Sequence, residues 1–134
     1  MISSALHGLN FQLCAVLLSI GVFTFVEYKL RAVLADVLNA CIGTNKCRMT
    51  SKKTCMSKNH KHTSNVWWVL LINSFFTIMT ILHLTYLGVM FEASFRIQEN
   101  GFSWSHTLNK WSDLKFFGHI TILIWFIIYL VLAN

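Results

Sequence analysis

Three long stretches of this sequence contain no charged residue and consist mainly of apolar ones. They cover residues 9–26, 66–91 and 116–133 and are 18, 26 and 18 residues long. As helices they would measure about 27, 39 and 27 Å, against about 30 Å for the hydrocarbon core of a bilayer. Only 12% of all residues are charged, well below the share typical of soluble domains. The sequence therefore predicts an all-α, polytopic membrane protein with about three transmembrane helices, near residues 3–26, 66–91 and 116–133.

The basic residues are distributed unevenly around these stretches. Eight of the eleven lie between the first two: Lys29, Arg31, Lys46, Arg48, Lys52, Lys53, Lys58 and Lys61. Basic loops stay on the cytosolic side during membrane insertion, so we expect loop 43–65 in the cytosol and residues 92–115 on the lumenal or exterior side. A basic run can also bind nucleic acid. Its position between two spans favours orientation and anionic lipid headgroups instead, and no nucleic-acid partner is expected.

Residues 28–42 have apolar side chains at spacings of three and four, which predicts an amphipathic helix at the interface or packed on other helices. Gly43 is expected to cap it. In the following loop, Cys47, Cys55, His60 and His62 are residue types that bind zinc, but the cysteine spacing does not match usual structural sites. We expect no metal and reduced thiols, and palmitoylation of Cys41 or Cys47 stays open.

The second stretch contains His83, with Thr80 and Tyr86 three residues away on either side. At helical spacing these three side chains form one polar stripe, which should face protein or a water-filled cavity. A hydrogen bond between helices is favoured for His83 over a place along a substrate path. His106 is expected at the surface and His119 at headgroup depth, and neither is a catalytic candidate.

His7 lies at the opening of the first stretch. On a helix, it would share a face with Asn10, Cys14, Leu18 and Gly21. Two interpretations follow: a hydrogen-bonded histidine at a helix end, or a general base in a cavity open to the lumen. The residues alone favour the first, because a single histidine is a weak signal.

A resemblance to a known family changes this weighting. The segment "SALHGLNFQLCAVLLSIGVFTFVEYKLRAVLADVLNACI" (4–42) resembles the carboxyl-terminal region of membrane-bound O-acyltransferases that modify Wnt proteins. The similarity continues through "ILHLTYLGVMF" (81–91) and "TLNKWSDL" (107–114). It implies that His7 is the catalytic histidine, and that a palmitoleoyl group passes from palmitoleoyl-CoA to a Wnt serine at the endoplasmic reticulum membrane.

The resemblance also implies what surrounds the site. Family members are much longer, so we expect residues 1–134 to form the carboxyl-terminal part of an acyltransferase domain whose remaining helices are partners of this chain. Palmitoleoyl-CoA would be a co-substrate, with no bound cofactor. Asn10, Cys14, His83 and Tyr86 are candidates for lining its channel. The competing hypothesis is a small three-span membrane protein without catalytic activity that acts as an assembly partner.

Overall fold

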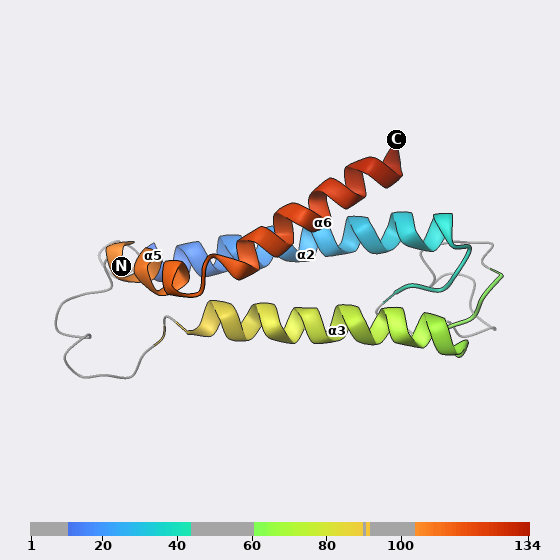
Figure 1. The fold of residues 1–134 in the computed structure, drawn as a ribbon, viewed down its shortest axis with the longest axis horizontal. Coiled ribbons are helices and arrows are strands. Elements are labelled where there is room, and N and C mark those ends of the chain that lie inside the picture. Colours follow the sequence, from blue (N-terminus) through green and yellow to red (C-terminus); the bar gives the residue numbers. More distant parts are fainter. Residues whose placement is uncertain (1–10, 44–60, 90, 92–103) are drawn as a thin grey trace, which may run out of the picture.

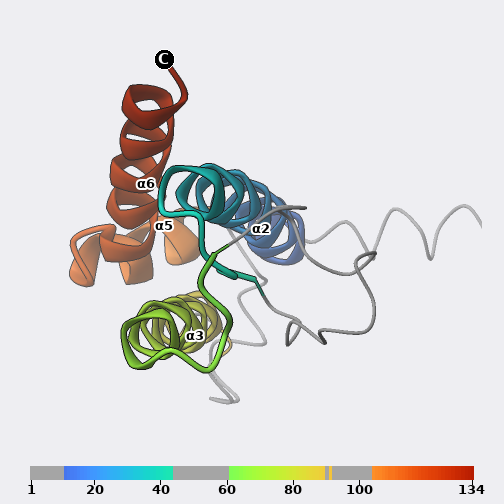
Figure 2. The same cartoon turned by 90° about the vertical axis from the view of Figure 1, so that its right-hand side faces the viewer.

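The computed structural model describes residues 11–43, 61–89, 91 and 104–134. Within these ranges the chain forms α2 (Phe11–Val37), α3 (Trp67–Gly88), α5 (Trp104–Asp113) and α6 (Phe117–Ala133). The three long helices α2, α3 and α6 run side by side in alternating directions, and α5 lies at the end where α2 begins (Figure 1). Seen along the bundle, α2 lies next to both α3 and α6 (Figure 2). The predicted all-α class is confirmed.

Two of the described helices, α2 and α3, are each long and apolar enough to cross a membrane. The shorter α5 and α6 pass the same test only as a pair, with a bend of 74° between them. The described residues thus hold two candidate spans, or three if the bent pair counts as one. Residues 92–115 were expected to be a connection between spans; α5 was not predicted there, although Trp104, Leu108 and Trp111 recur at helical spacing.

The first apolar stretch and the amphipathic segment that follows it form one helix. α2 continues without a break from the apolar stretch through Glu27 to Val37, so the amphipathic segment is packed in the bundle as part of α2. The helix ends through Asn39, which takes a left-handed conformation with φ 47°. Two backbone bonds, from Ala40 N–H to Ala35 O and from Asn39 N–H to Asp36 O, complete a Schellman motif. The expected cap at Gly43 is therefore wrong.

The bend between α5 and α6 has the same physical origin. α5 ends with bonds from Phe116 N–H to Trp111 O and from Lys115 N–H to Ser112 O, at 2.8 and 2.7 Å. Lys115 and Phe116 both take left-handed φ values, 52° and 50°. Because such values cost a non-glycine residue roughly 1–2 kcal/mol, this turn must be held in place by the packing around it.

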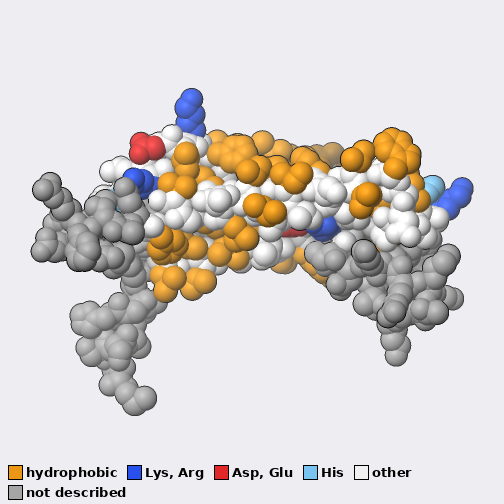
Figure 3. Space-filling model, turned by 90° about the horizontal axis from the view of Figure 1, so that it is seen from below, with side chains coloured by type: hydrophobic (Ala, Val, Ile, Leu, Met, Phe, Trp, Pro, Cys, Tyr) orange, Lys and Arg blue, Asp and Glu red, His pale blue; other side chains and the backbone are white. Residues whose placement is uncertain are grey.

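The interior of the bundle is apolar over most of its length. One buried cluster centres on Phe23, Val26, Phe76 and Trp125, and a second contains Val16, Tyr86, Leu87 and Trp111. The outward faces are also apolar, and the face in Figure 3 carries hydrophobic side chains along most of its length. A surface of this kind suits contact with lipid or with further helices rather than water.

Backbone hydrogen bonds join the two ends of the connection between α2 and α3. Cys41 N–H donates to His62 O at 2.9 Å, and His62 N–H donates to Asn39 O at 3.0 Å. The side chain of Cys41 is 3% exposed, which argues against its palmitoylation, because acylation requires an accessible thiol. Cys47, Cys55 and His60 lie outside the described residues.

Candidate functional site

The polar stripe predicted on α3 lies in the bundle interior. His83 and Tyr86 are buried, and the half-buried Thr80 points its hydroxyl group at a carboxylate on α2. Polar side chains in a membrane helix are stable only when they meet protein groups or water, which explains why this face turns inward. The stripe supplies residues to two clusters of polar side chains: His83 and Tyr86 belong to one, and Thr80 belongs to the other.

The first group joins three helices through one imidazole, and we call Ser19, His83, Tyr86, Trp111 and His119 the histidine–tyrosine cluster. The hydroxyl of Tyr86 lies 2.8 Å from Nδ1 of His119, and Oγ of Ser19 lies 3.4 Å from Nε2 of the same ring. Ser19 uses its only hydrogen to bond Ala15 O at 2.8 Å. The tautomer of His119 with its hydrogen on Nε2 satisfies both contacts, with Nδ1 accepting from the Tyr86 hydroxyl.

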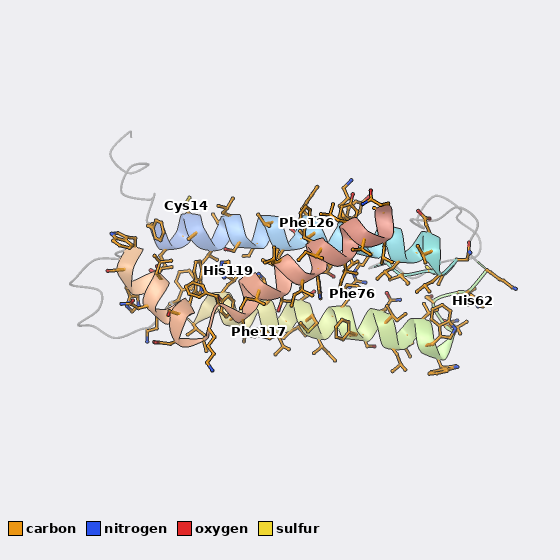
Figure 4. All side chains as sticks on the ribbon, turned by 45° about the horizontal axis from the view of Figure 1, so that its top comes forward. Cys14, His62, Phe76, Phe117, His119 and Phe126 are labelled. Carbon is orange, nitrogen blue, oxygen red and sulfur yellow. The ribbon has the colours of Figure 1, made fainter. Side chains whose placement is uncertain are left out.

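Aromatic rings enclose this imidazole. Trp111 of α5 lies with its ring centroid 4.6 Å from that of His119, at an angle of 62°. Trp111 also stacks on Tyr86, at 6.2 Å and 17°. Figure 4 shows His119 near the start of α6, toward the same end of the bundle as Cys14 of α2. His119 thus packs against neighbouring helices near the start of α6, and its expected place at headgroup depth stays a prediction.

His83 is held by packing. Its ring stacks on Phe23 of α2 with centroids 4.1 Å apart and 9° between the planes. Among the described residues neither of its ring nitrogens has a hydrogen-bond partner, although the side chain is only 3% exposed. The expected interhelical hydrogen bond of His83 is therefore absent from the described residues. A buried ring nitrogen without a partner costs about 1–3 kcal/mol.

A glycine lets α6 approach this group closely. A Cβ atom at Gly118 would overlap the ring of Tyr86 and would lie 3.0 Å from Nδ1 of His83. Any larger residue would push α6 away from α3 and lengthen the bond between Tyr86 and His119. Gly118 is therefore required for the geometry of the histidine–tyrosine cluster.

The second group is a buried ion pair on α2. Nε and Nη2 of Arg31 both lie 2.7 Å from Oε1 of Glu27, and the two residues are 5% and 8% exposed. The other carboxylate oxygen accepts from Thr80 Oγ1 at 3.0 Å, and Nη1 of Arg31 donates to Asn73 Oδ1 at 3.2 Å. The guanidinium also lies 4.4 Å from the centre of the Phe76 ring. We call Glu27, Arg31, Asn73 and Thr80 the ion-pair cluster.

Asn73 extends the ion-pair cluster to the end of α2. Its Nδ2 donates to the carbonyl of Cys41 at 3.2 Å, in the turn that pairs with His62. The ion-pair cluster therefore ties α2 to α3 and to the base of the intervening connection. Because Arg31 is neutralised inside the bundle, it adds no free charge to the basic loop that predicts the orientation.

The structure separates the site residues predicted from sequence. His7 and Asn10 lie outside the described residues, so their roles stay predictions. Cys14 is exposed in this chain, whereas His83 and Tyr86 are buried one turn apart on α3. Within the described part of the chain, no group of three or more histidine, cysteine, aspartate or glutamate side chains could hold a metal ion.

The contact between His119 and Ser19 was not predicted from the sequence, and Arg31 was counted only among the basic residues that predict the orientation, without its partner Glu27. The pair had a readable signal, because opposite charges four residues apart face each other on a helix. His119 had a weaker one in the preceding Gly118, which permits a close helix approach. Ser19 had none, since a serine in an apolar helix commonly bonds its own backbone.

The chain is similar in sequence to known proteins of several animals. No protein-family model matches it. It is 37% identical over 119 residues to the protein-serine O-palmitoleoyltransferase porcupine of Mus musculus, covering 87% of this chain and 24% of that protein. The porcupine of Homo sapiens is 36% identical over 119 residues, again 87% of this chain and 24% of that protein. The porcupine of Anopheles gambiae is 33% identical over 132 residues, 98% of this chain and 26% of that protein. The chain thus spans about a quarter of the curated relatives it matches.

Proposed function

We propose that this chain, a relative of porcupine over nearly its whole length, supplies the catalytic histidine of a membrane-bound protein-serine O-acyltransferase. The observation that carries the proposal is the similarity to relatives named for this activity, which runs through the segment containing His7. The apolar helices support a multi-pass membrane protein, and we place the intact enzyme in the endoplasmic reticulum membrane. Its substrates are a Wnt protein and palmitoleoyl-CoA.

His7 acts as a general base in the proposed reaction. Its neutral imidazole takes the proton of the Wnt serine hydroxyl as the serine oxygen attacks the thioester carbonyl of palmitoleoyl-CoA. The new carbon–oxygen bond forms the ester, the carbon–sulfur bond breaks, and the departing CoA thiolate takes the proton from the imidazolium. Acyl-CoA is consumed as a co-substrate.

The division of labour within the chain follows from its charges and contacts. The ion-pair cluster and the bond between Tyr86 and His119 hold helices together, and Ser19 spends its hydroxyl hydrogen on its own helix. We assign the reactive base to His7 on the similarity to porcupine, with the described helices as its scaffold.

Substitution of His7 tests the proposal in the intact enzyme. His7→Ala should lower acyl transfer to a Wnt peptide by a factor of about 10²–10⁴, the usual loss when a general base is removed. Expression and membrane insertion should not change. His60→Ala is the matched control, because it removes a histidine from the predicted cytosolic loop. Transfer by His7→Ala at the control rate, at equal protein level, would remove His7 from the mechanism.

A further inference from the structure

The short helix α5 packs one side against the bundle and leaves the other side exposed. Thr107 and Trp111 are buried, at 0% and 4% exposed, whereas Asn109 and Asp113 are exposed. Trp111 belongs to one buried cluster with Val16, which lies near the start of α2. Figure 1 shows α5 at that same end of the bundle. α5 therefore covers the start of α2.

The packed position of α5 leaves two polar atoms unpaired. Among the described residues, neither Oγ1 of Thr107 nor Nε1 of Trp111 has a hydrogen-bond partner, although both atoms are buried. Water would satisfy both atoms if α5 moved away from the bundle, so burying them without partners favours the detached position. In the ion-pair cluster, by contrast, every polar side chain is hydrogen-bonded. The contact of α5 therefore carries a cost that the contact of α2 with α3 at the ion-pair cluster does not.

The turn that joins α5 to α6 adds a second cost to the same position. Lys115 and Phe116 hold left-handed φ values of 52° and 50°, in a bend of 74° between the two helices. Side chains other than glycine disfavour such values, so packing of α5 must hold the turn. α5 has only ten residues, and a helix of that length is marginal on its own. Release of α5 would thus relieve the turn and cost little helical stability.

We propose that α5 is a lid that swings about Lys115 and Phe116 and uncovers the start of α2. In the closed position Trp111 lies against the imidazole of His119, with ring centroids 4.6 Å apart, and stacks on Tyr86. In the open position these two side chains lose that cover, and the unpaired atoms of α5 gain partners from water or lipid headgroups. The lid thus controls access to the histidine–tyrosine cluster from this end of the bundle. The motion is independent of the proposed acyl-transfer activity.

Hydrogen exchange of the intact protein in phospholipid nanodiscs measures the opening. Backbone amides of α5 should exchange about tenfold faster than those of α3, or more, because a lid opens without unfolding the bundle. Thr107→Val keeps the shape of the side chain and removes the unpaired hydroxyl, so it should slow exchange in α5 about tenfold. Thr85→Val is the matched control, because the exposed Thr85 hydroxyl bonds Ile81 O at 2.6 Å. It should leave exchange in α5 unchanged.

Labelling of a buried cysteine shows whether the opening exposes the start of α2. The Val16→Cys variant, in a protein whose native cysteines are serine, places a thiol in the cluster that α5 covers. The Val69→Cys variant places one in the other buried cluster. A water-soluble maleimide should modify the first at a rate that falls about tenfold when Thr107→Val is added. It should leave the second unmodified over the same time.

Three results would overturn the lid. Exchange in α5 as slow as in α3 would show that α5 stays packed. Unchanged or faster exchange in Thr107→Val would show that the hydroxyl of Thr107 does not weaken the closed position. Equal labelling of the Val16→Cys and Val69→Cys variants would show that the whole bundle opens instead of α5.

Discussion

Breaking the buried ion pair on α2 should destabilise the intact enzyme far more than replacing it. In Glu27→Ala, Arg31 keeps its bond to Asn73 but loses both 2.7 Å contacts to the carboxylate. A buried charge left without its partner costs about 3–5 kcal/mol. Thr80 loses its carboxylate contact but keeps the carbonyl of Phe76 as an acceptor at 2.8 Å, so its hydroxyl adds little to this cost. The double variant Glu27→Leu with Arg31→Met removes both charges, and it should be more stable than Glu27→Ala.

The measurement is the fraction of each variant that stays folded after heating in detergent, read by size-exclusion chromatography. Asp36→Ala is the matched control, because Asp36 is an exposed acid on the same helix and should change stability by less than about 0.5 kcal/mol. If Glu27→Ala unfolds at the same temperature as the control, the pair is not buried as described. If the double variant is less stable than Glu27→Ala, the cost does not come from an unpaired arginine.

Three further predictions concern the bend, the close helix approach and the orientation. Gly118→Ala should lower the unfolding temperature in the heating assay because its Cβ overlaps Tyr86, whereas Gly21→Ala, whose Cβ would meet no neighbouring element among the described residues, should not. Lys115→Gly should raise stability by about 1 kcal/mol by relieving the left-handed φ of 52°, and a loss of stability would show that the side chain of Lys115 is needed. In microsomes, a glycosylation acceptor placed in residues 92–115 should be modified and one in loop 43–65 should not, and the reverse pattern would invert the predicted topology.

The helices could be predicted where hydrophobicity alone determines them. The uncharged stretches correspond to α2, α3 and α6, and the period of Thr80, His83 and Tyr86 identified the inward face of α3. The span expected to about residue 26 and the helix expected over residues 28–42 form one continuous helix, which the charge of Glu27 does not interrupt. Glu27 is tolerated inside the bundle because Arg31, one turn later, offsets part of the cost of burying its charge.

The contacts of the candidate site depend on long-range geometry that local patterns do not contain. His119 meets Tyr86 only because α5 and α6 are joined by a sharp bend, and that bend uses two non-glycine residues in left-handed conformations. Lysine and phenylalanine are not residue types that predict a left-handed turn at a helix end, unlike glycine or asparagine. α5 escaped prediction for a related reason, because it is short and mostly polar.

A chimeric enzyme tests the proposed acyltransferase role most directly. The region of the mouse porcupine that matches this chain would be replaced by residues 1–134, and acyl transfer to a Wnt peptide would be measured at equal membrane protein level. The proposed function predicts that the chimera transfers the acyl group and that His7→Ala in the chimera abolishes the transfer. A chimera that inserts and folds like the parent but transfers no acyl group, or one that remains active with His7→Ala, would contradict it.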